Sequence, residues 1–126
     1  MATILIMDDE EAILGFLKQR LMGEGFNVLT ASDGKEGMNL FNDNQVDLVI
    51  TDIIMPDKDG FRMIIELKNI SQDIKIIVMS GGGHAHPKFY LDITKSLGVQ
   101  YTFQKPFKIS ALLEAVHELL KEEKTS

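Results

Sequence analysis

The sequence VDLVITD, residues 46–52, is a short apolar run that ends in a carboxylate. A run of this kind predicts a buried β-strand over residues 46–51, with Asp52 at its end. Similar runs occur elsewhere in the chain, at residues 4–7, 26–31, 74–79 and, in a shorter form, 101–103. Runs that stay apolar without alternation are typical of parallel strands that helices cover on both faces.

Helical patterns separate these runs. The first expected helix has five apolar side chains on one face, namely Ala12, Ile13, Phe16, Leu17 and Leu21. We expect Gly23 and Gly25 to end it. The sequence Ser32-Asp33-Gly34 opens a second, short helix that passes through Met38 and Phe41.

Residues 56–60 are rich in turn formers and predict a loop. The helix that follows is expected to turn Phe61, Ile64 and Ile65 inward. A fourth helix is expected around Ile93 and Leu97, with Gly98 at its end. The last helix carries apolar residues at helical spacing, at Leu112, Leu113, Val116, Leu119 and Leu120.

Five strands that alternate with five helices predict an α/β fold with a doubly wound parallel sheet. Right-handed connections favour the strand order 2-1-3-4-5, the flavodoxin-like arrangement. We expect one domain over residues 1–126, a length that suits a single core. In this topology, a ligand site lies beyond the carboxyl ends of the strands, where the first and third strands are neighbours.

Composition narrows the classes of protein to which the chain can belong. It has no cysteine, which excludes disulfides and thiolate chemistry and is compatible with a cytoplasmic location. The first residues do not resemble a signal peptide, and no apolar run approaches the roughly 20 residues that span a bilayer. A net charge of −6 argues against sequence-independent binding of nucleic acid.

Five polar residues fall at the predicted carboxyl ends of strands. Asp8 and Asp9 follow the first strand, Asp52 the third, Ser80 the fourth and Lys105 the fifth. Each residue alone is equally well explained as a helix cap or a turn former. Their common position at one edge of the sheet favours a shared site instead.

Three carboxylates crowded together need a cation, because at about 4 Å each pair repels by on the order of 4 kcal/mol at an effective dielectric constant near 20. A site with oxygen ligands and no thiol or histidine suits Mg²⁺. Lys105 adds a positive charge and Ser80 a hydroxyl donor. With Asp52 as an ionised nucleophile, the set fits phosphoryl transfer and requires no general base.

Four segments carry a resemblance to a known family: MDDE at 7–10, TDIIMPDKDG at 51–60, MSG at 79–81 and QKPF at 104–107. In this order and spacing, they resemble the receiver domain of two-component response regulators over nearly the whole chain. The resemblance implies a signalling switch and not a metabolic enzyme. Such a switch would catalyse only its own phosphorylation and dephosphorylation. A histidine kinase or phosphotransfer protein would phosphorylate Asp52.

The resemblance also assigns roles to single residues. Asp9, Asp52 and the backbone carbonyl of Ile54 would bind Mg²⁺ directly, and Asp8 would act through water. Lys105 would bind the phosphoryl group, and Ser80 would reorient toward it. A cis peptide bond is implied before the proline at position 106. The fourth helix, fifth strand and fifth helix would form the face that contacts an unidentified downstream protein.

Three positions depart from the family pattern. Thr102 stands where an aromatic switch residue is usual, and Tyr101 and Phe103 should face the other side of the sheet. We therefore expect an activated face without an aromatic rotamer change. In the family, the positions two residues after the aspartate and two after the hydroxyl residue tune dephosphorylation, and here they are Ile54 and Gly82. Neither can orient a water molecule through its side chain, so the resemblance implies a long-lived phosphoaspartate unless a phosphatase acts.

The glycine-rich segment at 81–87 predicts a mobile loop, in which His84 and His86 are read as solvated side chains and not as metal ligands. Glu10 and Glu11 are interpreted as acidic residues that favour the amino end of the first helix.

Two other functions stay open. An aspartate-nucleophile phosphohydrolase usually carries a second aspartate two residues after the nucleophile, where this chain has Ile54. A phosphorylation-independent interaction module would explain Thr102 but not the acidic site. A homodimer through the fourth helix, and the choice between a stand-alone receiver and part of a larger regulator, also stay open.

Overall fold

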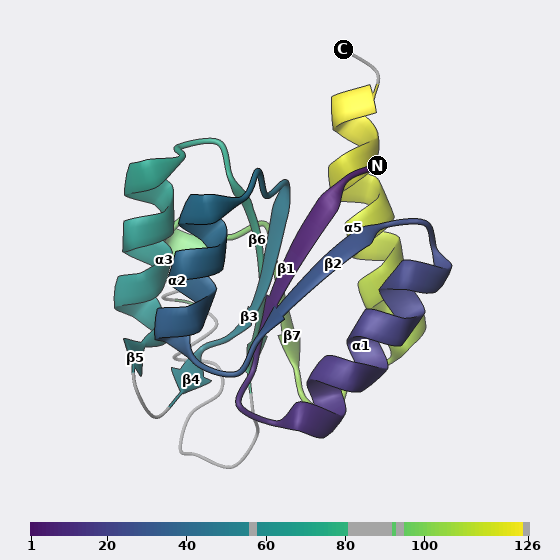
Figure 1. The fold of residues 1–126 in the computed structure, drawn as a ribbon, viewed down its shortest axis with the longest axis horizontal. Coiled ribbons are helices and arrows are strands. Elements are labelled where there is room, and N and C mark those ends of the chain that lie inside the picture. Colours follow the sequence, from purple (N-terminus) through teal and green to yellow (C-terminus); the bar gives the residue numbers. More distant parts are fainter. Residues whose placement is uncertain (56–57, 81–91, 93–94, 125–126) are drawn as a thin grey trace.

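The computed structural model describes residues 1–55, 58–80, 92 and 95–124. Its centre is a parallel sheet of five strands between two layers of helices (Figure 1). The strands are β1 (Thr3–Met7), β2 (Asn27–Ala31), β3 (Leu48–Asp52), β6 (Lys75–Ser80) and β7 (Tyr101–Gln104). Their order is β2-β1-β3-β6-β7, which confirms the predicted order 2-1-3-4-5.

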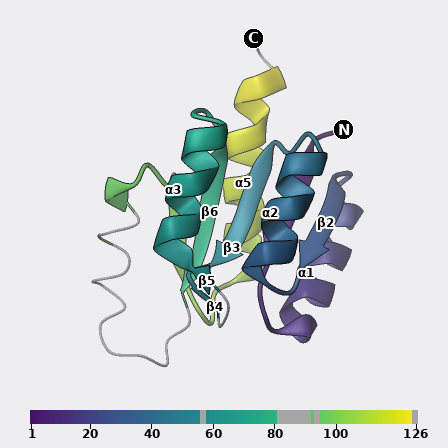
Figure 2. The same ribbon diagram turned by 60° about the vertical axis from the view of Figure 1, so that its left-hand side comes forward.

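The helices divide between the two faces of the sheet, as Figures 1 and 2 show. Helices α1 (Glu11–Gly23) and α5 (Ile109–Lys124) cover one face, and α2 (Gly34–Asp43) and α3 (Gly60–Ile70) cover the other. The fourth helix predicted around Ile93 falls mostly outside the described residues. Gly98, where that helix was expected to end, has a positive φ of 87°. None of the described helices is long and apolar enough to cross a bilayer.

Strand residues alternate between two cores. Ile4 and Ile6 of β1 contribute to the core beneath α1 and α5, whereas Leu5 and Met7 contribute to the core beneath α2 and α3. Strand β3 repeats this alternation and is buried along its whole length. The continuous apolar runs of the sequence therefore reflect strands with two covered faces.

The predicted inward faces of two helices are partly wrong. In α1 the buried residues are Leu14, Leu17 and Leu21, and the side chain of Phe16 is 48% exposed. In α3, Met63, Ile64 and Leu67 are buried, and Ile65 is 47% exposed. Neighbouring residues of a helix point about 100° apart, so a stripe chosen one or two residues out of phase includes an exposed side chain.

The two helices that follow β1 and β2 begin differently. At α2, the Asp33 carboxylate accepts a hydrogen bond from the backbone N–H of Glu36 at 2.7 Å, and the Glu36 carboxylate accepts one from Ser32 at 2.9 Å. Asp33 therefore caps the helix, as its predicted start requires, and Glu36 binds the residue that precedes the cap. At α1 the N-cap residue is Glu10, and its side chain makes no capping hydrogen bond.

A small hairpin follows β3, where the sequence predicted only a loop. Strand β4 (Ile54–Met55) pairs antiparallel with β5 (Lys58–Asp59). Gly60 begins α3 directly after this hairpin, and a Cβ at Gly60 would overlap the backbone carbonyl of Ile53. Only glycine allows the chain to pass this close to the residue that follows Asp52.

We predict that Gly60→Ala lowers the free energy of unfolding by about 1–3 kcal/mol, because the new methyl group must displace backbone. Gly15→Ala is the matched control: Gly15 lies within α1 and a Cβ there would meet nothing within 4 Å. The control should gain about 0.5–1 kcal/mol from helix propensity. Urea denaturation followed by circular dichroism measures both, and equal effects of the two substitutions would contradict the close approach at Gly60.

Candidate functional site

Four neighbouring strands bring polar residues to one edge of the sheet. Asp8 follows β1, Asp52 ends β3 and Ser80 ends β6. Lys105 follows β7, and its backbone N–H donates to the carbonyl of Ser80 at 2.7 Å. Because β1, β3, β6 and β7 are adjacent in the sheet, residues far apart in sequence lie side by side here.

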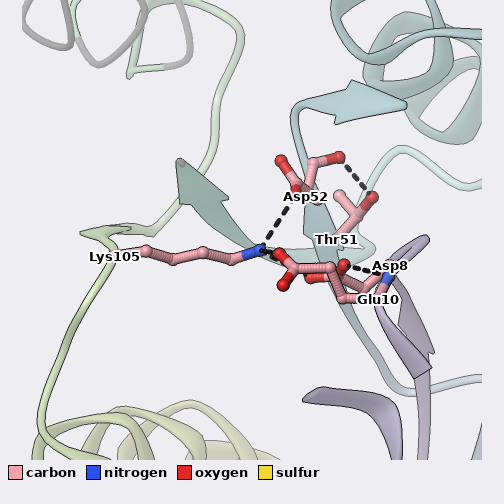
Figure 3. A network of polar contacts seen from close by, with 5 residues as sticks. All are labelled: Asp8, Glu10, Thr51, Asp52 and Lys105. Atoms are coloured by element: carbon pink, nitrogen blue, oxygen red, sulfur yellow. Dashed lines mark hydrogen bonds and ion pairs between the residues drawn. The ribbon is translucent and has the colours of Figure 1, made fainter. Parts of the chain in front are cut away.

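The side chain of Lys105 connects these strand ends (Figure 3). Its Nζ lies 2.8 Å from Oδ2 of Asp8 and 2.9 Å from Oδ2 of Asp52. A third carboxylate oxygen, Oε1 of Glu10, lies 3.3 Å from the same nitrogen. The sequence-predicted residues Asp8, Asp52 and Lys105 therefore form one cluster.

This cluster is largely shielded from water. The side chain of Asp8 is fully buried, that of Asp52 is 7% exposed and that of Lys105 is 13% exposed. Buried charges are costly unless they are paired, so each carboxylate depends on the ammonium group between them. Asp8 also accepts a hydrogen bond from the backbone N–H of Glu10 at 2.9 Å, which fixes its orientation.

Burial and pairing shift the pKa values within the cluster. Burial raises the pKa of Asp8 above its ordinary value of 3.8, and hydrogen bonds from Lys105 and Glu10 oppose this effect. Burial would lower the pKa of Lys105, but its contacts with Asp8 and Asp52 outweigh burial and raise that pKa. The lysine is therefore a permanent cation, whereas Asp8 holds a charge in surroundings that disfavour it.

Two buried hydroxyl groups lie close to the site and differ in their bonding. Oγ1 of Thr51 donates to the backbone carbonyl of Asp52 at 2.9 Å (Figure 3). Oγ of Ser80 is buried and has no hydrogen-bond partner in the described part of the structure. A buried hydroxyl without a partner is unusual in proteins, and here it leaves a hydrogen-bond donor unused beside the acidic cluster.

The carboxylate cluster differs in one member from the predicted magnesium ligands. Carboxylate oxygens of Asp8, Glu10 and Asp52 lie within 4.8 Å of one another, whereas Asp9 is exposed. Sequence reasoning missed Glu10 because an acidic residue before a helix is adequately explained by the helix dipole. The available signal was its position as an N-cap, where glutamate is not a preferred residue.

The residues present fit a divalent cation. Three carboxylates face one ammonium group, which leaves an excess of negative charge, and all donor atoms are oxygens. The unpartnered hydroxyl of Ser80 adds a donor for an anionic group. The assignment of Asp9 and the Ile54 carbonyl as ligands stays a prediction.

Thr102, which stands where an aromatic residue is usual in the resembled family, lies in strand β7. Thr102 is paired with Val78, and both side chains belong to the face that also carries Ser80. Tyr101 and Phe103 pack against the opposite core, where the hydroxyl of Tyr101 donates to Glu118 at 2.6 Å. Neither aromatic ring lies on the face of Ser80. Gly82, His84 and His86 lie outside the described residues.

Comparison with known proteins identifies the family. The sequence model of the response regulator receiver domain matches residues 4–117. The chain belongs to the response regulator receiver domain family. The cis peptide bond between Lys105 and Pro106, which the resemblance implied, is present. In this receiver domain, Asp8, Glu10 and Asp52 form the acidic pocket.

Individual relatives agree with this assignment. Transcriptional regulatory protein GlrR of Escherichia coli is 31% identical over 121 residues, which cover 96% of this chain and 27% of GlrR. A receiver domain protein from Clostridium thermocellum is 32% identical, with a TM-score of 0.87 and coverage of 99% and 98% of the two chains. Response regulator TrrA of Thermotoga maritima, solved in complex with Mg²⁺-BeF, is 34% identical, with a TM-score of 0.81 and coverage of 94% and 99%. The receiver domain spans about a quarter to a half of the curated relatives it matches.

Ser80→Ala should leave the free energy of unfolding of the receiver domain unchanged within about 0.5 kcal/mol, or raise it, because no hydrogen bond is lost. Thr51→Val is the matched control, since it removes a buried hydroxyl that is bonded, and it should cost about 1 kcal/mol. Both values are measured by urea denaturation without added metal. A larger loss for Ser80→Ala than for Thr51→Val would show that the Ser80 hydroxyl has a partner.

Lys105→Met should lower the free energy of unfolding by about 2–4 kcal/mol at neutral pH, because Asp8 and Asp52 lose their shared cation. The loss of Lys105 raises the pKa of Asp8 further above 3.8. Protonation of Asp8 then relieves the repulsion in acid, so the destabilisation appears as the pH rises through this raised pKa.

Denaturation curves over a range of pH measure the effect of Lys105→Met. Lys108→Met, which removes an exposed lysine three residues away, is the control and should change stability by less than about 0.5 kcal/mol. An equal loss of stability in acid and at neutral pH would contradict the role of Lys105 as a counter-ion.

Proposed function

We propose that this receiver domain accepts a phosphoryl group on a side-chain oxygen of Asp52 and thereby changes a protein-binding face. The observation that carries the proposal is the contact of 2.9 Å between Oδ2 of Asp52 and Nζ of Lys105, within a buried acidic pocket. Response regulators act with kinases and downstream effectors. The donor proposed here is the phosphohistidine of a histidine kinase or of a phosphotransfer protein.

The proposed reaction is a transfer between two nucleophiles. An oxygen of the Asp52 carboxylate forms a bond to phosphorus, the bond between phosphorus and the donor imidazole breaks, and the imidazole keeps the electron pair and takes up a proton. Lys105 stands next to the attacking group and can bind an oxygen of the transferred phosphoryl group as a point charge. A carboxylate needs no general base to attack, so positioning and charge compensation suffice.

Asp8, Asp9, Asp52 and the backbone carbonyl of Ile54 are the residues proposed to hold Mg²⁺. When bound, the ion would compensate the negative charge that develops on the phosphoryl oxygens. The acidic cluster supports the assignment of Asp8 and Asp52, which belong to it. A relative solved with Mg²⁺-BeF supports it independently.

The proposed response to phosphorylation begins at Ser80. Its unpartnered hydroxyl would donate to a phosphoryl oxygen, and the displacement would reach the face formed by the fourth helix, β7 and α5. Thr102 offers no ring to follow that movement, so the change would pass through the backbone of β7 and its neighbours. The downstream partner would be a protein or an attached output domain, without direct contact to nucleic acid or membrane.

Other features belong to the same proposal. The receiver domain is proposed to work in the cytoplasm as a switch and not as an enzyme with turnover on external phosphoesters. The hydrophobic Ile54, two residues after Asp52, supports this distinction because it cannot act as an acid or a base. A homodimer through the fourth-helix face is compatible with this function.

Incubation with acetyl phosphate and Mg²⁺ tests the proposal. We predict that intact-mass spectrometry detects one added phosphoryl group on the wild-type chain and none on Asp52→Asn. Asp43→Asn, which neutralises an exposed aspartate at the end of α2, should behave like wild type. An unmodified wild-type chain that also shows no NMR shift with beryllofluoride would leave only a phosphorylation-independent module. Continuous release of phosphate from many phosphoesters would indicate a phosphohydrolase.

A further inference from the structure

Glu10 has an unusual position at the amino end of α1. It is the N-cap residue, with extended backbone, yet its carboxylate caps no backbone N–H of the helix. The side chain instead points toward Lys105, and its Oε1 lies 3.3 Å from Nζ of Lys105 (Figure 3). The helix thus begins without the side-chain cap that serine, threonine or aspartate would provide there.

The contact with Glu10 completes the hydrogen bonding of Lys105. An ammonium group has three hydrogens to donate. In the structure three carboxylates accept them, from Asp8 at 2.8 Å, Asp52 at 2.9 Å and Glu10 at 3.3 Å. A phosphoryl oxygen that binds Lys105 therefore competes with these acceptors for its hydrogens.

The three acceptors differ in how easily they can be released. Asp8 is fully buried and is held by a second hydrogen bond from the backbone of Glu10. Asp52 is the proposed site of phosphorylation, so its side chain stays beside Lys105 when it carries the phosphoryl group. Glu10 makes the longest contact, and its side chain is 61% exposed, so water can solvate it as soon as it departs.

We propose that Glu10 is a positioning residue that occupies the third hydrogen of Lys105 in the unphosphorylated domain and yields it to the phosphoryl group. This inference rests on the proposed phosphorylation of Asp52. Glu10 holds the ammonium in place between Asp8 and Asp52 while the site is free, and it competes with the incoming group for the same hydrogen. Its negative charge also opposes the approach of an anionic phosphodonor.

The inference predicts opposite consequences for the two states of the site. Glu10→Gln weakens the restraint on Lys105 in the metal-free domain, because a neutral amide is a poorer acceptor for an ammonium group. The same substitution removes a competitor for the phosphoryl group and should speed phosphorylation. Both effects should be about two- to five-fold, the range that corresponds to one exposed ion pair.

The first measurement needs neither metal nor phosphodonor. In the presence of a chelator, NMR of the lysine side-chain ammonium groups reports how fast the hydrogens of Lys105 exchange with water. We expect Glu10→Gln to accelerate this exchange about two- to five-fold. Glu11→Gln is the matched control, because Glu11 is an exposed glutamate in the first turn of the same helix. It should leave the exchange of Lys105 unchanged.

The second measurement is the rate of phosphorylation by acetyl phosphate, followed by intact mass at Mg²⁺ concentrations that saturate each variant. Glu10→Gln should be about two- to five-fold faster than wild type, and Glu11→Gln should match wild type. Phosphorylation of Glu10→Gln that is slower than wild type at saturating Mg²⁺, or that needs more Mg²⁺ than wild type to reach saturation, would assign Glu10 to metal binding and overturn the proposal.

The two proposals fail in distinguishable ways. If the wild-type chain takes up no phosphoryl group, the proposed function itself is wrong. If the wild type is phosphorylated on Asp52 but Glu10→Gln and Glu11→Gln behave alike in either measurement, only the role of Glu10 is wrong.

Discussion

The ammonium group of Lys105, placed between the buried carboxylates of Asp8 and Asp52, is the interaction on which the rest of the site depends. Two carboxylates at the edge of a covered sheet would repel each other and resist burial. A single lysine offsets both, and its backbone is fixed by a hydrogen bond to the last residue of β6. The parallel order β1-β3-β6-β7 therefore places Lys105 within reach of both carboxylates.

Much of this arrangement was predictable, because the fold and the site share one cause. Apolar runs without alternation indicate parallel strands covered on both faces, and the carboxyl ends of parallel strands meet at one edge. That argument alone predicts that Asp8, Asp52 and Lys105 lie together. The argument needed only strand positions to within a residue or two, which apolar runs such as residues 46–51 provide.

The remaining features depend on distances that a sequence pattern does not contain. Phe16 and Ile65 fit the apolar spacing of a helix, yet each lies outside the buried face of its helix. The sequence around β4 and β5 is rich in turn-forming residues, which predict a loop and give no sign of the antiparallel pairing. Glu10 was explained by the helix dipole, because nothing in the sequence shows that its side chain crosses to Lys105. In each case, contacts made in the folded chain determine the structure, and local sequence preference does not.

In the proposed phosphorylation, the buried hydroxyl of Ser80 affects how strongly the site would bind a phosphoryl oxygen. Its removal from water was completed when the domain folded, so an arriving oxygen meets a donor that has no solvent to shed and no competing bond to break. The unpaired hydroxyl slightly lowers the stability of the unbound domain. A bound phosphoryl oxygen would then be held more tightly, because the donor is already positioned. Such preorganisation ties the responsiveness of the site to the native structure as a whole, since local loosening around β6 would let water reach the hydroxyl and weaken the response.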